Sequence, residues 1–215
     1  RNSHRNFKQK MEYISKKWKF ISTQDLEDHF VGRKKLYGDN VLLTFDDGFH
    51  SNKVIADEIL NPLGIKALFF VVTNFVALEE ENDQVEFIKN NLYPDWRGHD
   101  YPQNIHNMKS LSYEDLKSLN ASGHTIGCHT ANHLNLSAIS DRDSLEKEII
   151  QSCIDLEKKI GTPVEHFSFG FGNVEFFSKE ALKISRKKFK YIYTGMRGDN
   201  SKSKLPWALR RDTIS

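Results

Sequence analysis

The chain has 215 residues, of which 31 are basic and 29 acidic, so its formal net charge is +2. This length suits one α/β domain, which buries roughly 70% of the surface that the unfolded chain exposes. The near-balance of charge argues against nucleic acid as a partner. No stretch approaches the roughly 20 apolar residues of a membrane helix, so we expect no transmembrane segment.

Cysteine use and the start of the chain bear on where the protein works. Cys128 and Cys153 form neither a disulfide framework nor a Cys-x-x-Cys metal pair, which is compatible with a reducing compartment. No secretory signal pattern is present, although the chain begins at Arg1 rather than Met, which suggests that an upstream segment was removed. We expect a cytoplasmic location, with association to the cell envelope as the alternative. The oligomeric state stays open.

Residues 1–36 are predicted to form an N-terminal helical segment that belongs to the same domain as residues 37–215. Phe7, Met11 and Ile14 recur at helical spacing, and Thr23 is expected to cap a second short helix. Basic residues crowd the positions before 20. A solvated face is the expected role for them, with contact to an anionic polymer or a membrane surface as the alternative.

Residues 41–45 are an apolar run that predicts a buried strand, and Asp46, Asp47 and Gly48 follow it directly. Neighbouring side chains on a strand point to opposite faces. The two carboxylates can therefore face one site only if the chain turns immediately after Phe45. Taken alone, this stretch favours a simple Asp-Gly turn at the end of a strand.

Strand-like and helix-like segments then alternate along the chain. The predicted strands are 65–72, 124–128, 167–172, 191–196 and 209–214, and the predicted helices are 54–60, 112–119, 144–160 and 178–188. This alternation of about six or seven unequal βα repeats favours a barrel-like or strongly curved parallel sheet. Residues 79–110 interrupt it, and we expect a long polar, aromatic-bearing excursion over one rim.

His129 and His133 lie four residues apart, directly after the predicted strand 124–128. One turn of helix would place both imidazoles on the same face. In a parallel sheet this pair and the Asp46-Asp47 pair both follow the carboxyl ends of strands, where such folds carry their sites. Two histidines and one carboxylate predict a three-ligand site for one divalent metal ion, with zinc as the expected element and one position left for water.

The same residues resemble the two leading motifs of the polysaccharide deacetylase family, also called the NodB-homology domain or carbohydrate esterase family 4. The two motifs are Thr44-Phe45-Asp46-Asp47-Gly48 and His129-Thr130-x-x-His133. Weaker similarity covers residues 64–71, 112–116, 123–130, 167–172 and 205–210. The resemblance implies an α/β fold, a distorted, incomplete (β/α) barrel of about seven parallel strands, with residues 37–215 as the deacetylase-like catalytic domain.

The resemblance implies a metal-dependent hydrolase that removes an N-acetyl group from an amino sugar of a surface polysaccharide or its precursor. Asp46 would act as general base. Asp47, His129 and His133 would hold the metal ion that activates a water. Thr130 would brace the loop of ligands beside the substrate.

Three further residues are expected at the substrate. Trp96 would stack against a sugar ring, although the aromatic residues of its segment could equally fold inward. Backbone N–H groups around Phe171 and Gly172 could stabilise the oxyanion, because glycine lets the backbone approach closely. The alternative for Phe171 is a purely structural aromatic of the core.

The third family motif departs from its usual pattern in this chain. Gly170 stands at the place of a proline, and Ser168 near that of an arginine that pairs with the catalytic aspartate in many members. Asp46 therefore lacks its expected cation unless Arg210 or Arg211 reaches it, and on this basis we place Arg210 in the predicted catalytic set.

A late histidine that serves as general acid in many members is also missing, because no histidine follows His166. His99 and His106 are candidates by position only. The main alternative function is a catalytically degenerate carbohydrate-binding or scaffold domain of the same fold. A deacetylase or amidase that acts on a small nucleotide-linked sugar would differ only in its substrate.

Overall fold

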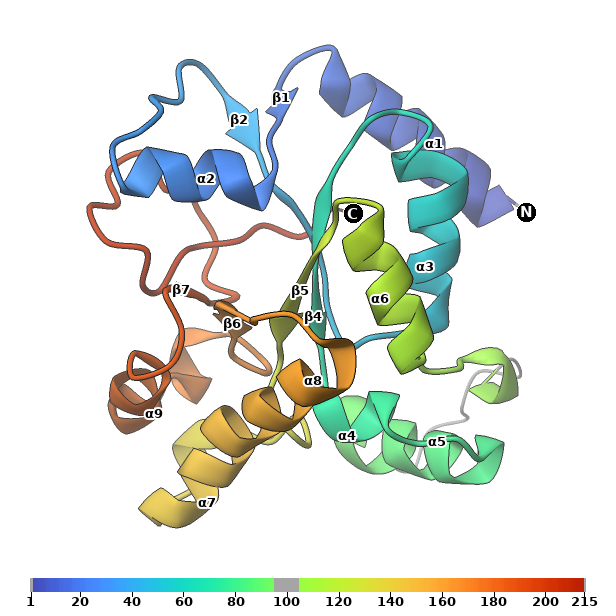
Figure 1. Ribbon diagram of the computed structural model, residues 1–215, viewed down its shortest axis with the longest axis vertical. Coiled ribbons are helices and arrows are strands. Elements are labelled where there is room, and N and C mark those ends of the chain that lie inside the picture. The colour runs from blue at the N-terminus through green and yellow to red at the C-terminus, as the bar shows by residue number, and fades with distance from the viewer. Residues whose placement is uncertain (1, 95–104, 215) are drawn as a thin grey trace.

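The computed structural model describes residues 2–94 and 105–214 and shows an α/β fold built on a curled, parallel half-barrel sheet (Figure 1). The sheet holds five strands in chain order, all paired in parallel: β3 (Leu43–Phe45), β4 (Ala67–Val71), β5 (Thr125–Cys128), β6 (His166–Ser168) and β7 (Tyr191–Tyr193). A separate parallel pair joins β1 (Lys19–Phe20) to β2 (Asn40–Val41). The expected strand 41–45 is thus divided between the two sheets, because Val41 belongs to β2 and Leu43–Phe45 forms β3.

Helices connect the strands, as parallel pairing requires. They are α1 (Asn2–Ser15), α2 (Thr23–Phe30), α3 (His50–Ile55), α4 (Thr73–Val76), α5 (Glu81–Phe87), α6 (Tyr113–Ala121), α7 (Arg142–Glu146), α8 (Ser152–Ile160) and α9 (Lys179–Ser185). Single π-helical turns extend three of them: η1 (Ala56–Leu60), η2 (Ile88–Leu92) and η6 (Lys147–Gln151). Short 3-10 turns are η4 (Ile105–Asn107), η5 (Leu136–Ala138) and η7 (Val174–Phe176).

Local sequence signals account for several helix ends. Ser112 begins α6 in a reciprocal capping box with Asp115, as the sequence predicts. The cap of α2 is Ser22 rather than Thr23, because Ser22 makes the same exchange with Asp25. Gly161 ends α8 in the left-handed conformation that glycine adopts without steric cost. None of the helices in residues 2–94 and 105–214 is long and apolar enough to cross a membrane.

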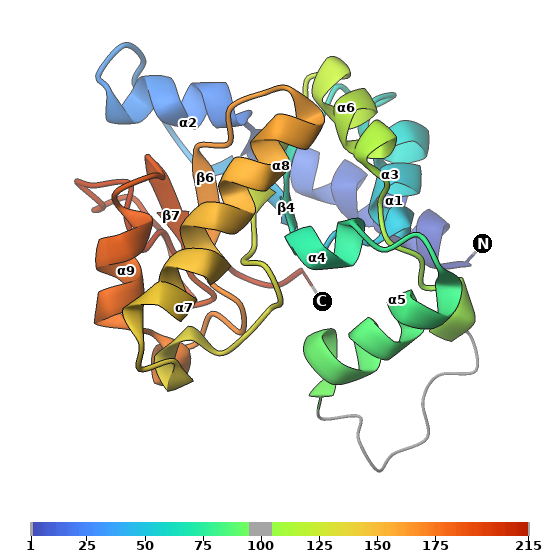
Figure 2. The same cartoon turned by 60° about the horizontal axis from the view of Figure 1, so that its bottom comes forward.

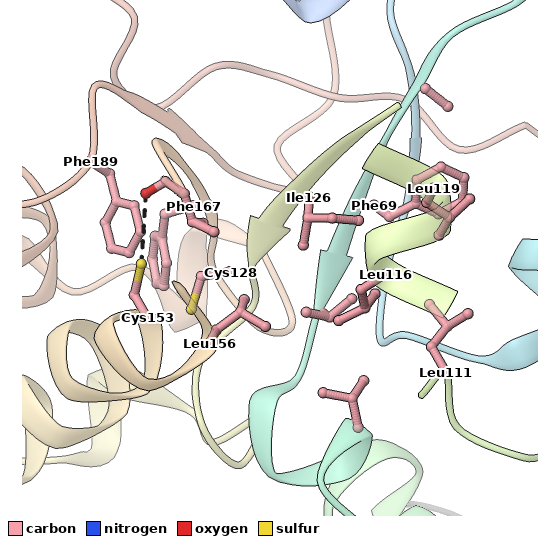
Figure 3. Packing of buried hydrophobic residues seen from close by; sticks show 14 of the residues in the cluster. Phe69, Leu111, Leu116, Leu119, Ile126, Cys128, Cys153, Leu156, Phe167 and Phe189 are labelled. Carbon is pink, nitrogen blue, oxygen red and sulfur yellow. Dashed lines mark hydrogen bonds between the residues drawn. The ribbon is translucent and has the colours of Figure 1, made fainter. Parts of the chain in front are cut away.

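The core lies on both faces of the sheet. Alternate residues of β4 divide between them: Phe69 packs in the cluster under the outer helices, whereas Phe70 packs in a second cluster with Tyr193 and Leu209. Figure 3 shows the first cluster, in which Leu116 and Leu119 of α6 and Leu156 of α8 pack against the same face of the sheet. Met11 and Ile14 bring α1 into this cluster as well.

Two predicted segments differ from expectation. The described part of residues 79–110 is mainly helical, since the acidic run at Glu81 begins α5 rather than a loop. The predicted strand 209–214 is reduced to one parallel bridge between Leu209 and Tyr193. Figures 1 and 2 show that α2 lies at one end of the half-barrel, whereas α4 and α5 lie at the end to which β4 points.

Candidate metal centre

A turn directly after β3 brings Asp46 and Asp47 to the same site. Asp47 has a left-handed backbone (φ 72°), and the Gly48 N–H donates to the Asp46 carbonyl at 2.9 Å. Gly48 is itself packed so closely that a Cβ there would lie 3.0 Å from Val76. The alternation of the strand therefore ends at Asp46. This is the turn after Phe45 that we expected to be necessary for two adjacent carboxylates to face one site.

His129 and His133 lie on an irregular loop after β5, not on the expected turn of helix. Thr130 (φ 68°) and His133 (φ 56°) both adopt the left-handed conformation, and the His133 N–H donates to Thr130 Oγ1 at 2.8 Å. This bond closes the loop and leaves the two imidazole centroids 5.1 Å apart. A side-chain hydrogen bond within the loop thus brings the two imidazoles together, where we expected a turn of helix to do so.

The two imidazoles converge on one oxygen of Asp47. His129 Nε2 lies 3.7 Å and His133 Nε2 3.6 Å from Asp47 Oδ1, and one ligand atom from each residue lies within 4.8 Å of the others. Each ring donates its Nδ1–H to a carbonyl, His129 to Ser168 at 2.8 Å and His133 to Asn91 at 3.2 Å. Both Nε2 atoms therefore present lone pairs to the centre, as metal-binding imidazoles do.

The electrostatics of this cluster also fit a cation. Burial, reinforced by the charge of Asp46, raises the pKa of Asp47 to about 7. Burial and the neighbouring His129 ring lower the pKa of His133 to about 4, and burial lowers that of His129. Neutral imidazoles beside a carboxylate that is costly to ionise form a donor set that a divalent cation would stabilise.

Asp46 has the cationic partner that the third motif does not supply. Arg211 donates Nη1 to Asp46 Oδ1 at 2.7 Å and Nη2 to Oδ2 at 2.9 Å, in a bidentate pair. Burial disfavours the charged carboxylate, but the Arg211 guanidinium outweighs it and holds the pKa of Asp46 below its ordinary value. Arg211 Nη2 also donates to Ser168 Oγ at 2.8 Å.

Of the two candidate arginines, the prediction that placed Arg210 in the catalytic set requires correction. Arg210 is exposed, and its Nη1 donates to the Arg197 carbonyl at 3.4 Å. The reason is local: adjacent residues of this extended segment point to opposite sides, and the side chain directed towards Asp46 is that of Arg211.

Thr130 also differs from its predicted place beside the substrate. Its side chain is fully buried, with 0% exposure, and its hydroxyl accepts the His133 N–H. It braces the loop of ligands through this hydrogen bond. The structure therefore places Thr130 as a brace of the loop, with no exposed surface for the predicted contact with substrate.

Phe171 and Gly172 lie in a tight turn over His133. Phe171 has φ 62°, and its ring centroid lies 4.6 Å from that of His133. Gly172 packs against Gly195 so closely that a Cβ would lie 2.4 Å from the Gly195 nitrogen. The Gly172 N–H already donates to the Gly170 carbonyl at 2.8 Å, so it is not free to bind an oxyanion.

The remaining candidates fall away from the centre or outside the described residues. His106 pairs with Glu81 at 3.1 Å on an exposed surface, and Trp96 and His99 lie outside the described ranges. Sequence reasoning missed Asn91, whose carbonyl orients His133. A backbone acceptor leaves no mark in a sequence, so no signal could have identified it.

Solved structures of bacterial proteins share the fold. IcaB from Ammonifex degensii matches with a TM-score of 0.76 at 23% identity, covering 98% of this chain and 84% of that chain. The Streptococcus pyogenes deacetylase PplD, solved in complex with acetate, matches with a TM-score of 0.73 at 20% identity over 97% of this chain and 79% of that one. The BpsB deacetylase domain from Bordetella bronchiseptica matches with a TM-score of 0.71 at 17% identity, covering 94% and 81% respectively.

Sequence comparison identifies the family. No curated protein matches the chain. The family model described as polysaccharide deacetylase matches residues 33–189, which is more than half of the chain. That range contains Asp46, Asp47, His129 and His133, and the chain therefore belongs to the polysaccharide deacetylase family.

Proposed function

We propose that the protein is a metal-dependent de-N-acetylase that acts on an N-acetylated amino sugar of a polysaccharide or its precursor. The observation that carries this proposal is the separation of two adjacent carboxylates into different roles. Asp47 joins His129 and His133 in a ligand set, whereas Asp46 is bound by Arg211 on its other side. A site with one metal-facing and one cation-paired carboxylate suits amide hydrolysis.

Asp47, His129 and His133 would hold the ion, and their two imidazoles favour zinc. When bound, such a cation lowers the pKa of a water and polarises the acetamide carbonyl. Asp46 lies next to the ligands, 3.9 Å from His129 Nε2, where it would take a proton from the attacking water. Hydrolysis would add the water oxygen to the acetyl carbon and break the C–N bond. The proton that Asp46 takes from the water would pass to the leaving nitrogen, so that the products are acetate and a free amine.

Arg211 and Phe171 would assist this reaction. The bidentate pair fixes the orientation of the Asp46 carboxylate and keeps it ionised. Among the bonds of the described residues, none occupies the Phe171 N–H, so this group is a candidate donor to the oxyanion. Its ring, next to His133, would limit the access of water to the ligands.

A carbohydrate-binding or scaffold domain is the second candidate function. Two departures from the family pattern support it: the apparent loss of the arginine that pairs with the catalytic aspartate, and the absence of a histidine after His166. Because Arg211 forms this pair from another part of the chain, the first of these supports is weakened.

Metal content and acetate release, measured together, separate these functions. We expect wild-type protein to bind about one zinc ion and to release acetate from some members of a panel of N-acetylated amino-sugar oligomers and precursors. Asp46→Asn should retain the metal and lose acetate release, whereas His133→Ala should lose both. Metal bound by wild-type protein without acetate release from any member of the panel would favour the binding function.

A further inference from the structure

A buried carboxylate lies behind the loop of ligands and outside the motifs discussed above. Glu148, on η6, is 6% exposed, and both of its oxygens accept hydrogen bonds from a single residue. Asn132 donates its backbone N–H to Oε2 at 3.0 Å and its Nδ2 to Oε1 at 2.6 Å. The Glu148 carbonyl accepts the Ala131 N–H at 3.0 Å. Glu148 therefore fixes two consecutive residues immediately before His133.

Asn132 is linked to His133 by further hydrogen bonds. Asn74 Nδ2 donates to Asn132 Oδ1 at 2.7 Å, and Asn91 Nδ2 donates to the Asn132 carbonyl at 2.9 Å. The Asn91 carbonyl in turn accepts the Nδ1–H of His133 at 3.2 Å. A continuous chain of hydrogen bonds thus runs from Glu148 through Asn132 and Asn91 to the imidazole.

The loop needs such support because its conformation is unfavourable by itself. Thr130 and His133 are both left-handed, and a residue with a Cβ keeps this conformation only where its surroundings hold it. The hydroxyl of Thr130 closes the inside of the loop, and Glu148 holds its outside. Without the contact from Glu148, the loop would no longer hold the His133 imidazole in one orientation.

We propose that Glu148 is a positioning residue of the metal centre, which acts through Asn132 to hold His133 in place with its Nε2 towards Asp47. This inference rests on the proposed function. The position requires a carboxylate, because Asn132 offers two donors and only a carboxylate presents two acceptors. A glutamine would turn its own NH₂ towards the N–H or NH₂ of Asn132, so one of the two bonds would become a repulsive contact.

The first test compares Glu148→Gln with Glu157→Gln. Glu157, on α8, also accepts a backbone N–H, from Val164 at 2.7 Å, but it lies outside the chain of bonds that reaches His133. We expect zinc affinity, measured by chelator competition, to fall roughly 10- to 100-fold in Glu148→Gln and to stay unchanged in Glu157→Gln. The absorption spectrum of the Co²⁺-loaded protein should change in Glu148→Gln alone. Urea unfolding of both metal-free variants measures any general loss of stability.

A donor–acceptor exchange tests the pair directly. Asn132→Asp alone places two carboxylates against each other and should weaken zinc binding. Glu148→Gln with Asn132→Asp restores one donor and one acceptor on each side, so the double variant should bind zinc more tightly than either single variant. A double variant no better than the worse single variant would overturn the proposal.

A third measurement needs no metal and therefore separates this inference from the proposed function. In metal-free wild-type protein, ¹⁵N spectra of the imidazoles should show His133 as the Nδ1–H tautomer, and in Glu148→Gln as a mixture of tautomers. An unchanged tautomer with unchanged zinc affinity in Glu148→Gln refutes the role of Glu148. If wild-type protein releases no acetate but the tautomer and zinc affinity change as expected in Glu148→Gln, the proposed function is refuted and the role of Glu148 stands.

Discussion

Replacing Arg211 by alanine tests how the site activates Asp46. The substitution removes two charge-assisted hydrogen bonds to the carboxylate, together with the bond from Nη2 to Ser168. Among the described residues, Arg211 bonds none of the three ligand side chains. We therefore expect Arg211→Ala to retain its metal and lose turnover.

The size of the effect follows from the pair. The Arg211 side chain is 15% exposed and that of Asp46 35%, so solvent screens the interaction only in part. A hydrogen bond to a charged group contributes about 1.5–3 kcal/mol, and about 1.4 kcal/mol changes a rate tenfold. Losing the equivalent of one such bond in the transition state should lower kcat/KM roughly 10- to 100-fold. Because the guanidinium lowers the pKa of Asp46, its removal should also shift the acid limb of the pH–rate profile to higher pH.

The assay is acetate release as a function of pH, with zinc content measured on the same samples. Arg210→Ala is the matched control, because its neighbouring guanidinium is exposed and directed away from the site. Its activity should stay within about twofold of the wild-type value. Arg211→Lys should lie between the two, since an ammonium supplies charge without the bidentate geometry. Equal activity in Arg211→Ala and Arg210→Ala would refute the role assigned to the pair.

Two further predictions concern backbone packing and acid stability. Gly172→Ala should destabilise the protein and lower turnover more than Gly161→Ala does. Both positions are left-handed, but only at Gly172 does a backbone atom lie 2.4 Å from the new Cβ. Urea midpoints and acetate release measure the two effects, and equal losses in both variants would contradict the prediction. Burial, followed by the charge of Lys66, lowers the pKa of His124 to about 4, so its contribution to stability is complete above its ordinary value of 6.5 and is lost as the pH falls towards 4. Between pH 7 and pH 4 the free energy of unfolding of the wild-type protein should therefore fall by up to about 3 kcal/mol more than that of His124→Asn. Urea midpoints that change with pH in parallel for the two proteins would show that His124 does not titrate as described.

Residue patterns that act locally were sufficient to predict much of the fold. The apolar run before Asp46 gives a strand, Ser112 with Asp115 gives a capped helix, and Gly161 gives a helix end. Each depends on residues within a few positions of one another. Their alternation also predicts the parallel sheet, because parallel strands require helical crossovers.

The parts of the site that depend on distant contacts were harder to predict. The spacing of His129 and His133 fits a helix, but the actual loop is stabilised by Thr130 from inside and by Glu148 from outside. Neither contact follows from spacing alone. The same limit applies to Asn91, which contributes a carbonyl from a helical segment about 40 positions before His133.

The third motif has Ser168 near the place of an arginine, and Arg211 supplies the missing cation to Asp46 across the open side of the half-barrel. In the described residues β3 and β7 are the outer strands of the sheet, with no ladder joining them. Arg211 crosses this gap, because its Nε donates to the Thr194 carbonyl after β7 and its Nη1 to Thr44 of β3. Ser168 accepts Nη2 at 2.8 Å, so a larger side chain at that position would displace the guanidinium. Ser168 and Arg211 are therefore coupled: the small residue in the third motif makes room for a cation that reaches Asp46 from the last segment of the chain.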